Sequence, residues 1–84
     1  MEVILNIKRG ALKKQVGYLF KKERQKLDLT QEQLAELADL DANNLSRIER
    51  GEQLPDFITF TKLCQALQID LMDHSGKIIR MTKY

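Results

Sequence analysis

The sequence predicts a mainly all-α fold, a compact bundle of four to five helices, on three observations. Apolar residues recur at three- and four-residue steps near the start of the chain and again in its last third, as in amphipathic helices. Thr30 and Asp41, residue types that begin helices, stand directly before two short segments between those stretches. No repeat, low-complexity tract or Gly/Ser linker divides the 84 residues, so we expect a single domain over residues 1–84.

The first helix is predicted over roughly residues 12–26. Its apolar positions at helical spacing are Leu12, Val16, Leu19, Phe20 and Leu27. Gly17 weakens this helix slightly, and Asp28 interrupts the pattern. We interpret Tyr18 and Phe20 as packing residues rather than as a platform for base stacking, because Phe20 falls in the core register.

Two short helices joined by a tight turn at 39–41 are predicted next. Thr30 and Gln33 make a capping box, in which the threonine oxygen accepts a backbone N–H and the glutamine side chain reaches back. Asp41 caps the second helix, and Gly51 ends it. The expected spans are about 31–38 and about 42–50. The residues expected to face inward are Leu34, Ala35, Ala38, Leu45 and Ile48, with Ala35 as the small residue where the two helices cross.

A last helix is predicted from Pro55 and Asp56 to about Gln68. Its apolar positions are Phe57, Phe60, Leu63, Cys64 and Leu67. The two ends of the chain have a different pattern. Alternating residues over Met1–Ile7 suit a half-buried strand. Residues 69–72 and 77–82, on either side of a turn at 73–76, read either as two short strands or as a fraying helix, with β-branched Ile78 and Ile79 favouring strands.

Composition narrows the functional classes. The single cysteine cannot form an internal disulfide, no signal peptide is recognisable, and no apolar run approaches the roughly 20 residues of a membrane span. We therefore expect a cytoplasmic protein with no membrane association. A domain this short buries only about 60% of its unfolded surface, which favours completing the core with a second copy.

Charge is unevenly distributed, although the net charge is only +2. Residues 1–26 hold eight Lys or Arg against two acids, whereas residues 27–60 hold two against eight. Residues 61–84 hold four against two. A basic segment beside an acidic one can steer a protein onto phosphate in a fixed orientation, but a solvated helix face has the same composition, so charge alone decides nothing.

The helix expected at 42–50 presents a polar outer face. This face consists of Ala42, Asn43, Asn44, Ser46, Arg47 and Arg50. Asparagine can pair bidentately with adenine and arginine with guanine, so the face has the chemistry of a major-groove reader. Taken by itself, such a helix is more often an ordinary solvent face.

The order of the whole motif supports the DNA-binding interpretation. The run Arg24-x-x-Leu27-x-Leu29-Thr30-Gln31-Glu32-Gln33-Leu34-Ala35, then Leu45-Ser46-Arg47-Ile48-Glu49-Arg50-Gly51, Pro55 and Leu63-Cys64-Gln65-Ala66-Leu67, resembles the Cro/CI-type (XRE-like) helix-turn-helix family of phage repressors and their bacterial relatives. The resemblance extends from about Leu12 to Ile69. Asp39 departs from it, since the family often has glycine at this turn. Aspartate tolerates the left-handed conformation better than most residues, so the turn remains plausible.

The resemblance implies roles for individual residues. Ala42, Asn43 and Arg47 match positions that face base edges. Gln31 matches a residue that grips a phosphate. Asn44 and Ser46 match positions that contact backbone or bases, and Arg50 on the same face is placed with them. Arg24 and Glu49 match a pair that forms a partly buried salt bridge, and an acid this close to DNA needs such neutralisation.

No catalytic or metal site is expected. Cys64 lies on the apolar side of the last helix and is interpreted as a buried structural thiol. His74 has no cysteine or second histidine at ligand spacing. There is no Gly-rich phosphate loop and no nucleophile–base pair, so we expect no enzyme activity and no cofactor.

These observations predict a transcription regulator, a repressor that binds a palindromic operator in double-stranded DNA as a homodimer. The core would span 12–69, with the terminal segments 1–11 and 70–84 available for dimerisation. We expect the helices to cover their own apolar faces, which leaves the terminal residues Val3, Leu5, Ile7, Ile69, Leu71, Ile78 and Ile79 for the dimer. The alternative is an antitoxin, in which the tail 71–82 adds strands to a toxin protein.

Overall fold

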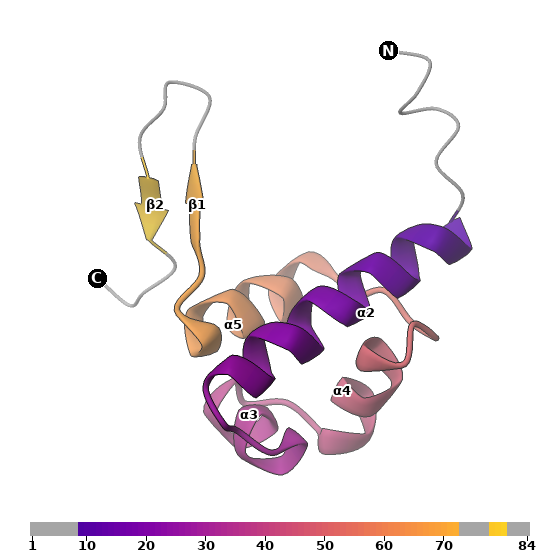
Figure 1. Cartoon of the computed structure of the whole chain (residues 1–84), viewed down its shortest axis with the longest axis horizontal. Coiled ribbons are helices and arrows are strands. Elements are labelled where there is room, and N and C mark those ends of the chain that lie inside the picture. The colour runs from indigo at the N-terminus through magenta and orange to yellow at the C-terminus, as the bar shows by residue number, and fades with distance from the viewer. Residues whose placement is uncertain (1–8, 73–77, 81–84) are drawn as a thin grey trace.

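A computed structural model describes residues 9–72 and 78–80 of the chain. Within these residues, four helices are followed by a two-stranded antiparallel hairpin (Figure 1). The elements are α2 (Arg9–Lys26), α3 (Gln31–Leu37), α4 (Ala42–Glu49), α5 (Phe57–Leu67), β1 (Asp70–Met72) and β2 (Ile78–Arg80). The predicted mainly helical fold is confirmed, and the helix boundaries agree within three residues. None of the helices described is long and apolar enough to cross a membrane.

The starts of three helices are fixed by side-chain caps. The Thr30 hydroxyl accepts the Gln33 N–H at 3.0 Å, and the Gln33 side chain accepts the Thr30 N–H at 2.8 Å, which confirms the capping box. Asp41 accepts the Asn43 N–H at 2.9 Å at the start of α4. Asp56 does the same for Thr59 in α5, and that backbone hydrogen bond lowers the pKa of Asp56.

All four helices end with a residue in the left-handed conformation. These residues are Asp28, Asp39, Gly51 and Gln68, with φ between 55° and 77°. Each helix end has the two backbone hydrogen bonds of a Schellman motif, as where the Leu40 N–H bonds to the Ala35 carbonyl and the Asp39 N–H to the Glu36 carbonyl. The left-handed turn expected at Asp39 is therefore confirmed, and a residue other than glycine occupies this conformation at three of the four ends.

The core lies between α2, α3, α4 and α5. It contains all five inward residues predicted for the two short helices. Its buried apolar side chains are Phe20, Leu34, Ala35, Ala38, Leu45, Ile48, Leu63, Cys64 and Leu67. Phe20 and Phe60 meet edge to face, with ring centroids 5.4 Å apart. Burying each large apolar side chain contributes about 1.5–3 kcal/mol to the free energy of folding, so this cluster supplies most of the driving force for folding.

Gly17 lies where α2 crosses α4. A Cβ at this position would overlap the backbone carbonyl oxygen of Ile48 and lie 3.0 Å from that of Glu49. The absence of a side chain therefore sets the separation of the two helices. The helix propensity of Gly17 does not predict this crossing. Ala35, the small residue predicted where α3 and α4 cross, is also buried.

Several residues predicted on apolar stripes are exposed. Leu12 and Leu19 on α2, and Leu27 just after its end, are each more than a third exposed, because only a narrow line through Val16, Phe20 and Arg24 meets the core. Tyr18, interpreted as a packing residue, is exposed and has the Lys22 Nζ 5.8 Å above its ring. The most exposed is Phe57 (79%), because it begins α5 before the helix reaches the core. Those stripe predictions are wrong.

The C-terminal segment forms strands rather than a fraying helix. β1 and β2 pair with Leu71 opposite Ile79 and Met72 opposite Ile78. Ile69, which is predicted to take part in the dimer contact, lies partly buried against the core. The strand expected at 1–7, the turn at 73–76 and His74 lie outside the described residues.

Candidate nucleic-acid interface

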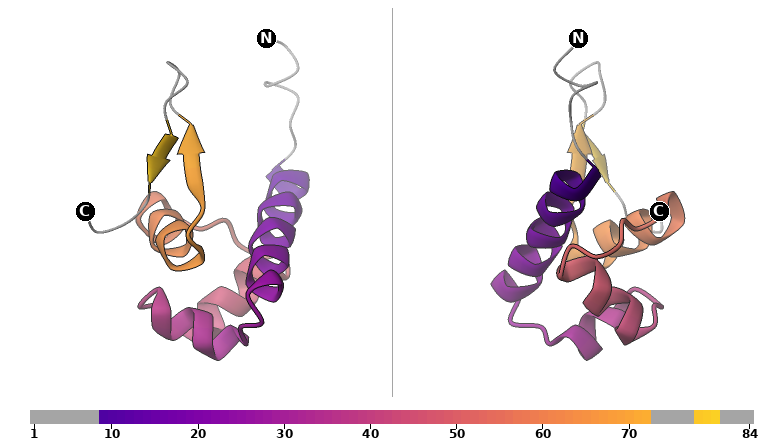
Figure 2. Two further views of the ribbon diagram at one scale, coloured as in Figure 1. Left: turned by 60° about the vertical axis from the view of Figure 1, so that its left-hand side comes forward. Right: turned by 90° about the vertical axis from the view of Figure 1, so that its right-hand side faces the viewer.

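The unit formed by α3, its turn and α4 lies at the end of the molecule opposite the hairpin (Figure 2). Leu45 and Ile48 pack α4 against the core, and neither residue has any exposed surface. These residues define the inner side of α4. Positions 43, 47 and 50 lie on the opposite side and are exposed. The short helix is thus fixed on one side and open to solvent on the other.

Glu49 is the centre of a polar network behind this helix. Its carboxylate accepts hydrogen bonds from Arg24 Nε at 2.8 Å and from Arg24 Nη2 at 3.0 Å. Arg24 Nη1 also donates to the carbonyl of Leu29 at 2.7 Å. The Glu49 residue is only 7% exposed, and its hydrogen bond raises the pKa of Arg24. The structure therefore brings Arg24 and Glu49 together and joins α2, the turn before α3 and the end of α4.

Gln31 belongs to the same network. Its amide Nε2 donates to Glu49 Oε1 at 3.0 Å. Gln31, which the resemblance matches to a phosphate contact, is therefore half-buried, and Glu49 fixes its side chain. One amide hydrogen and the amide oxygen stay uncommitted among the described hydrogen bonds.

The outer face of α4 divides into free and engaged side chains. Within the described parts of the chain, the Asn43 and Arg47 side chains make no hydrogen bond or ion pair, and both are exposed. Arg50 donates to Ser46 Oγ at 2.6 Å and to Glu52 Oε2 at 2.9 Å. Its hydrogen bond to Glu52 raises the pKa of Arg50 and lowers the pKa of Glu52.

Glu52 was not anticipated as part of this face. Glu52 forms an ion pair with Arg50, and the positive charge of Arg47 also lowers the pKa of Glu52. Its signal in the sequence is the Arg50-Gly51-Glu52 run, in which the left-handed glycine turns the two charges toward each other. Ala42 and Asn44 lie half-buried at the edges of the face.

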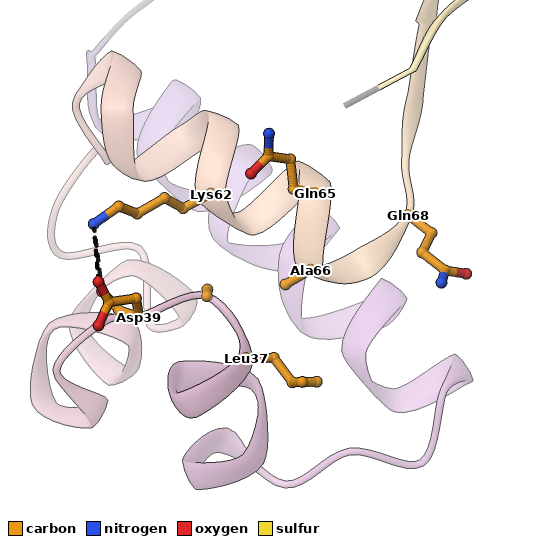
Figure 3. Close-up of a pocket in the computed structure, with 7 residues that line it drawn as sticks. Leu37, Asp39, Lys62, Gln65, Ala66 and Gln68 are labelled. Carbon is orange, nitrogen blue, oxygen red and sulfur yellow. Dashed lines mark hydrogen bonds and ion pairs between the residues drawn. The ribbon is translucent and has the colours of Figure 1, made fainter. Parts of the chain in front are cut away.

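A groove of about 510 Å³ lies away from this face, between α3 and α5 (Figure 3). Lys62 crosses its rim, where Nζ lies 3.8 Å from an Asp39 carboxylate oxygen and 3.4 Å from the Asp39 carbonyl oxygen. None of the residues singled out for DNA contact lines it. Among the residues with described side chains, no three histidine, cysteine or carboxylate groups gather as they would around a metal ion.

Comparison with known families and structures defines the class of protein. The helix-turn-helix family HTH_3 matches residues 20–73, so the chain belongs to this family of DNA-binding transcription regulators. No curated protein sequence gives a match.

Solved structures agree with this assignment. The restriction-modification controller protein C.AhdI from Aeromonas hydrophila is 32% identical, with a TM-score of 0.68 over 70% of this chain and 89% of that one. An R35A mutant of the restriction-modification controller protein C.Esp1396I is 31% identical, with a TM-score of 0.66 over 69% and 77% of the two chains. An HTH_3 family transcriptional regulator from Vibrio cholerae is 28% identical, with a TM-score of 0.68. The alignment with that regulator covers 71% of this chain and only 34% of the Vibrio protein.

Proposed function

We propose that this protein is a sequence-specific transcriptional repressor that inserts α4 into the major groove of its operator. The observation that carries the proposal is the free, exposed pair Asn43 and Arg47 on a helix whose other side is buried and anchored by Glu49. Direct base reading requires a helix with a fixed backbone that carries free amide and guanidinium groups. Each group must meet a base edge without a rearrangement of the helix.

The proposed contacts differ along the face. Asn43 and Arg47 make hydrogen bonds to base edges, and Ala42 contributes an apolar contact such as one with a thymine methyl group. Gln31, Asn44, Ser46 and Arg50 contact the backbone or bases. For Gln31 this contact uses the amide hydrogen that Glu49 leaves free. Arg50 contacts phosphate with the two guanidinium N–H groups that its hydrogen bonds to Glu52 and Ser46 leave free.

The regulator acts as a homodimer on a palindromic site. One α4 covers only half a site, and dimers of helix-turn-helix proteins read two half-sites about 34 Å apart. The terminal segments 1–11 and 70–84 are the proposed dimer contact, supported by the apolar residues that pair across β1 and β2. A second exposed apolar surface, Phe57 and Ile58 at the start of α5, is the competing location.

Selection from a random pool of DNA duplexes, followed by sequencing, tests the proposal. We expect recovery of an inverted repeat whose half-site centres are about 10 base pairs apart or a multiple of that. Recovery of a single unrepeated site would contradict binding as a homodimer. Failure to enrich any sequence would contradict sequence-specific binding itself.

Two further candidates concern the biological role. Sequence identity of 32% and 31% to two restriction-modification controller proteins supports control of restriction-modification genes. The β1–β2 hairpin supports the antitoxin alternative, in which the tail 71–82 adds strands to a toxin protein. Affinity capture from the native host tests the antitoxin alternative, since a stoichiometric second protein supports the antitoxin and a lone homodimer supports a simple repressor or a restriction-modification controller.

A further inference from the structure

The outer face of α2 carries a concentration of positive charge that the proposed role of α4 does not use. This basic face of α2 consists of Lys14, Tyr18, Lys21, Lys22 and Lys26, all of them exposed. Gly17 and Phe20 are buried on the opposite side of the same helix. Lys22 and Lys26 therefore lie on the side of α2 away from the core, whereas Lys14 at the edge of the face lies next to Gly51 at the end of α4.

The charges on this face are poorly compensated. Glu23 is the one carboxylate on α2, and it pairs with Lys26 at 3.0 Å. Among the residues that the structure describes, Lys14, Lys21 and Lys22 form no ion pair. Lys22 and Lys26 are four residues apart, a spacing at which like charges destabilise a helix. The first turn of α2 also lacks an acid to complement the helix dipole. A polyanion on this face would relieve the repulsion between its lysines.

The recognition half of the molecule has the opposite charge. Residues 27–60 carry two basic groups against eight acids, including Glu52 beside Arg50. Attraction between protein and phosphate supplies most non-specific affinity for DNA, and α4 with its surroundings is poorly equipped for it. The basic face of α2 has the charge that α4 lacks.

We infer that the basic face of α2 binds a second stretch of DNA phosphate backbone, outside the groove that α4 enters; this rests on the proposed function of α4. The partner is nucleic acid rather than protein because lysine is depleted at protein interfaces, which need apolar anchors. Phosphate binding through counterion release needs none. The Lys22 ammonium, positioned over the Tyr18 ring, presents its charge at the middle of the face. The second stretch is either flanking DNA of the operator molecule or a separate duplex.

Salt dependence of binding to a random 20-base-pair duplex tests the charge contribution. Lys21→Gln and Lys22→Gln should each lower the slope of log K against log salt by about 1. Lys62→Gln on α5 is the matched control, with the same change of charge, and it should leave the slope unchanged. Equal slopes for all three variants and the wild type would overturn the inference. This measurement needs no operator, so it remains decisive even if the selection enriches no sequence.

Protein saturated with a short duplex of the selected sequence distinguishes the two sources of phosphate. Capture of a fluorescent random duplex by this complex indicates a separate duplex. A few-fold gain in affinity from lengthening the operator duplex by 20 base pairs of random flank indicates flanking DNA. Either effect should disappear in the Lys21→Gln/Lys22→Gln protein, while Lys62→Gln retains it. If wild type shows neither effect, the basic face of α2 is only a solvated surface.

Discussion

The side-chain amide of Gln31 donates a hydrogen bond to the Glu49 carboxylate at 3.0 Å, beside the two hydrogen bonds that Glu49 accepts from Arg24. One buried carboxylate therefore fixes the first residue of α3, the last residue of α4 and the C-terminal part of α2 relative to one another. The orientation of α4 depends on this network, so its loss should affect both folding and DNA binding.

Arg24→Ala should reduce the free energy of unfolding by about 3 kcal/mol, because it leaves the buried Glu49 without its cation. DNA affinity should fall as well, since α4 loses its anchor. Urea unfolding measures the first effect. Lys26→Ala, which breaks the exposed pair with Glu23, is the control and should cost less than about 1 kcal/mol. Equal stability of the two variants would show that the Glu49 network does not hold the helices together.

Gly17→Ala should destabilise the protein by about 1–3 kcal/mol, the usual cost of overpacking, because its methyl group meets the Ile48 carbonyl oxygen and must push α2 away from α4. Gly10→Ala on the same helix meets nothing within 4 Å and should instead be neutral or stabilising by up to about 1 kcal/mol. Thermal melting of both variants checks this pair. A Gly17→Ala protein as stable as wild type would mean that the helices can separate at little cost.

Gln68→Gly should stabilise the protein by about 1 kcal/mol, because Gln68 adopts φ 58° after α5 and glycine relieves that strain. Gln65→Gly, at an exposed position inside α5, should destabilise by a similar amount. Chemical denaturation measures both. If Gln68→Gly lowered stability as Gln65→Gly does, the left-handed helix end would not be a source of strain.

Removing residues 71–84 should give a folded monomer with much weaker operator binding, because the gain from linking two half-sites is lost. Analytical ultracentrifugation measures the oligomeric state. Phe57→Ser/Ile58→Ser removes the competing apolar surface and should remain dimeric. The reverse result, a dimeric truncation and a monomeric double variant, would move the interface to the start of α5.

Local signals in the sequence were sufficient for the helices and their ends. The Thr30 capping box and the left-handed Asp39 depend on residues within five positions of one another, so short-range chemistry determined them. The polar outer face of α4 followed from helical periodicity alone. These are the features that could be predicted without knowledge of the tertiary structure.

Features that depend on how distant segments meet could not be predicted. Gly17 is a weak helix former in the sequence and a crossing point in the structure, because Ile48 lies more than thirty residues away. Phe57 fits the apolar period of α5, yet none of the other elements that the structure describes covers the start of that helix. The amide of Gln31 was matched to phosphate, and its bond to Glu49 appeared only when α3 and α4 were placed together.

The specificity ratio of Arg47→Ala tests the central claim most directly. Affinity for the selected sequence and for a random duplex is measured at one salt concentration for wild type and variant. The account predicts a loss of about 1–3 kcal/mol on the selected sequence with nearly unchanged binding to the random duplex, because the free guanidinium of Arg47 reads a base edge. Equal loss on both duplexes would contradict the account, since it would reduce Arg47 to a phosphate contact and leave α4 without its principal reader.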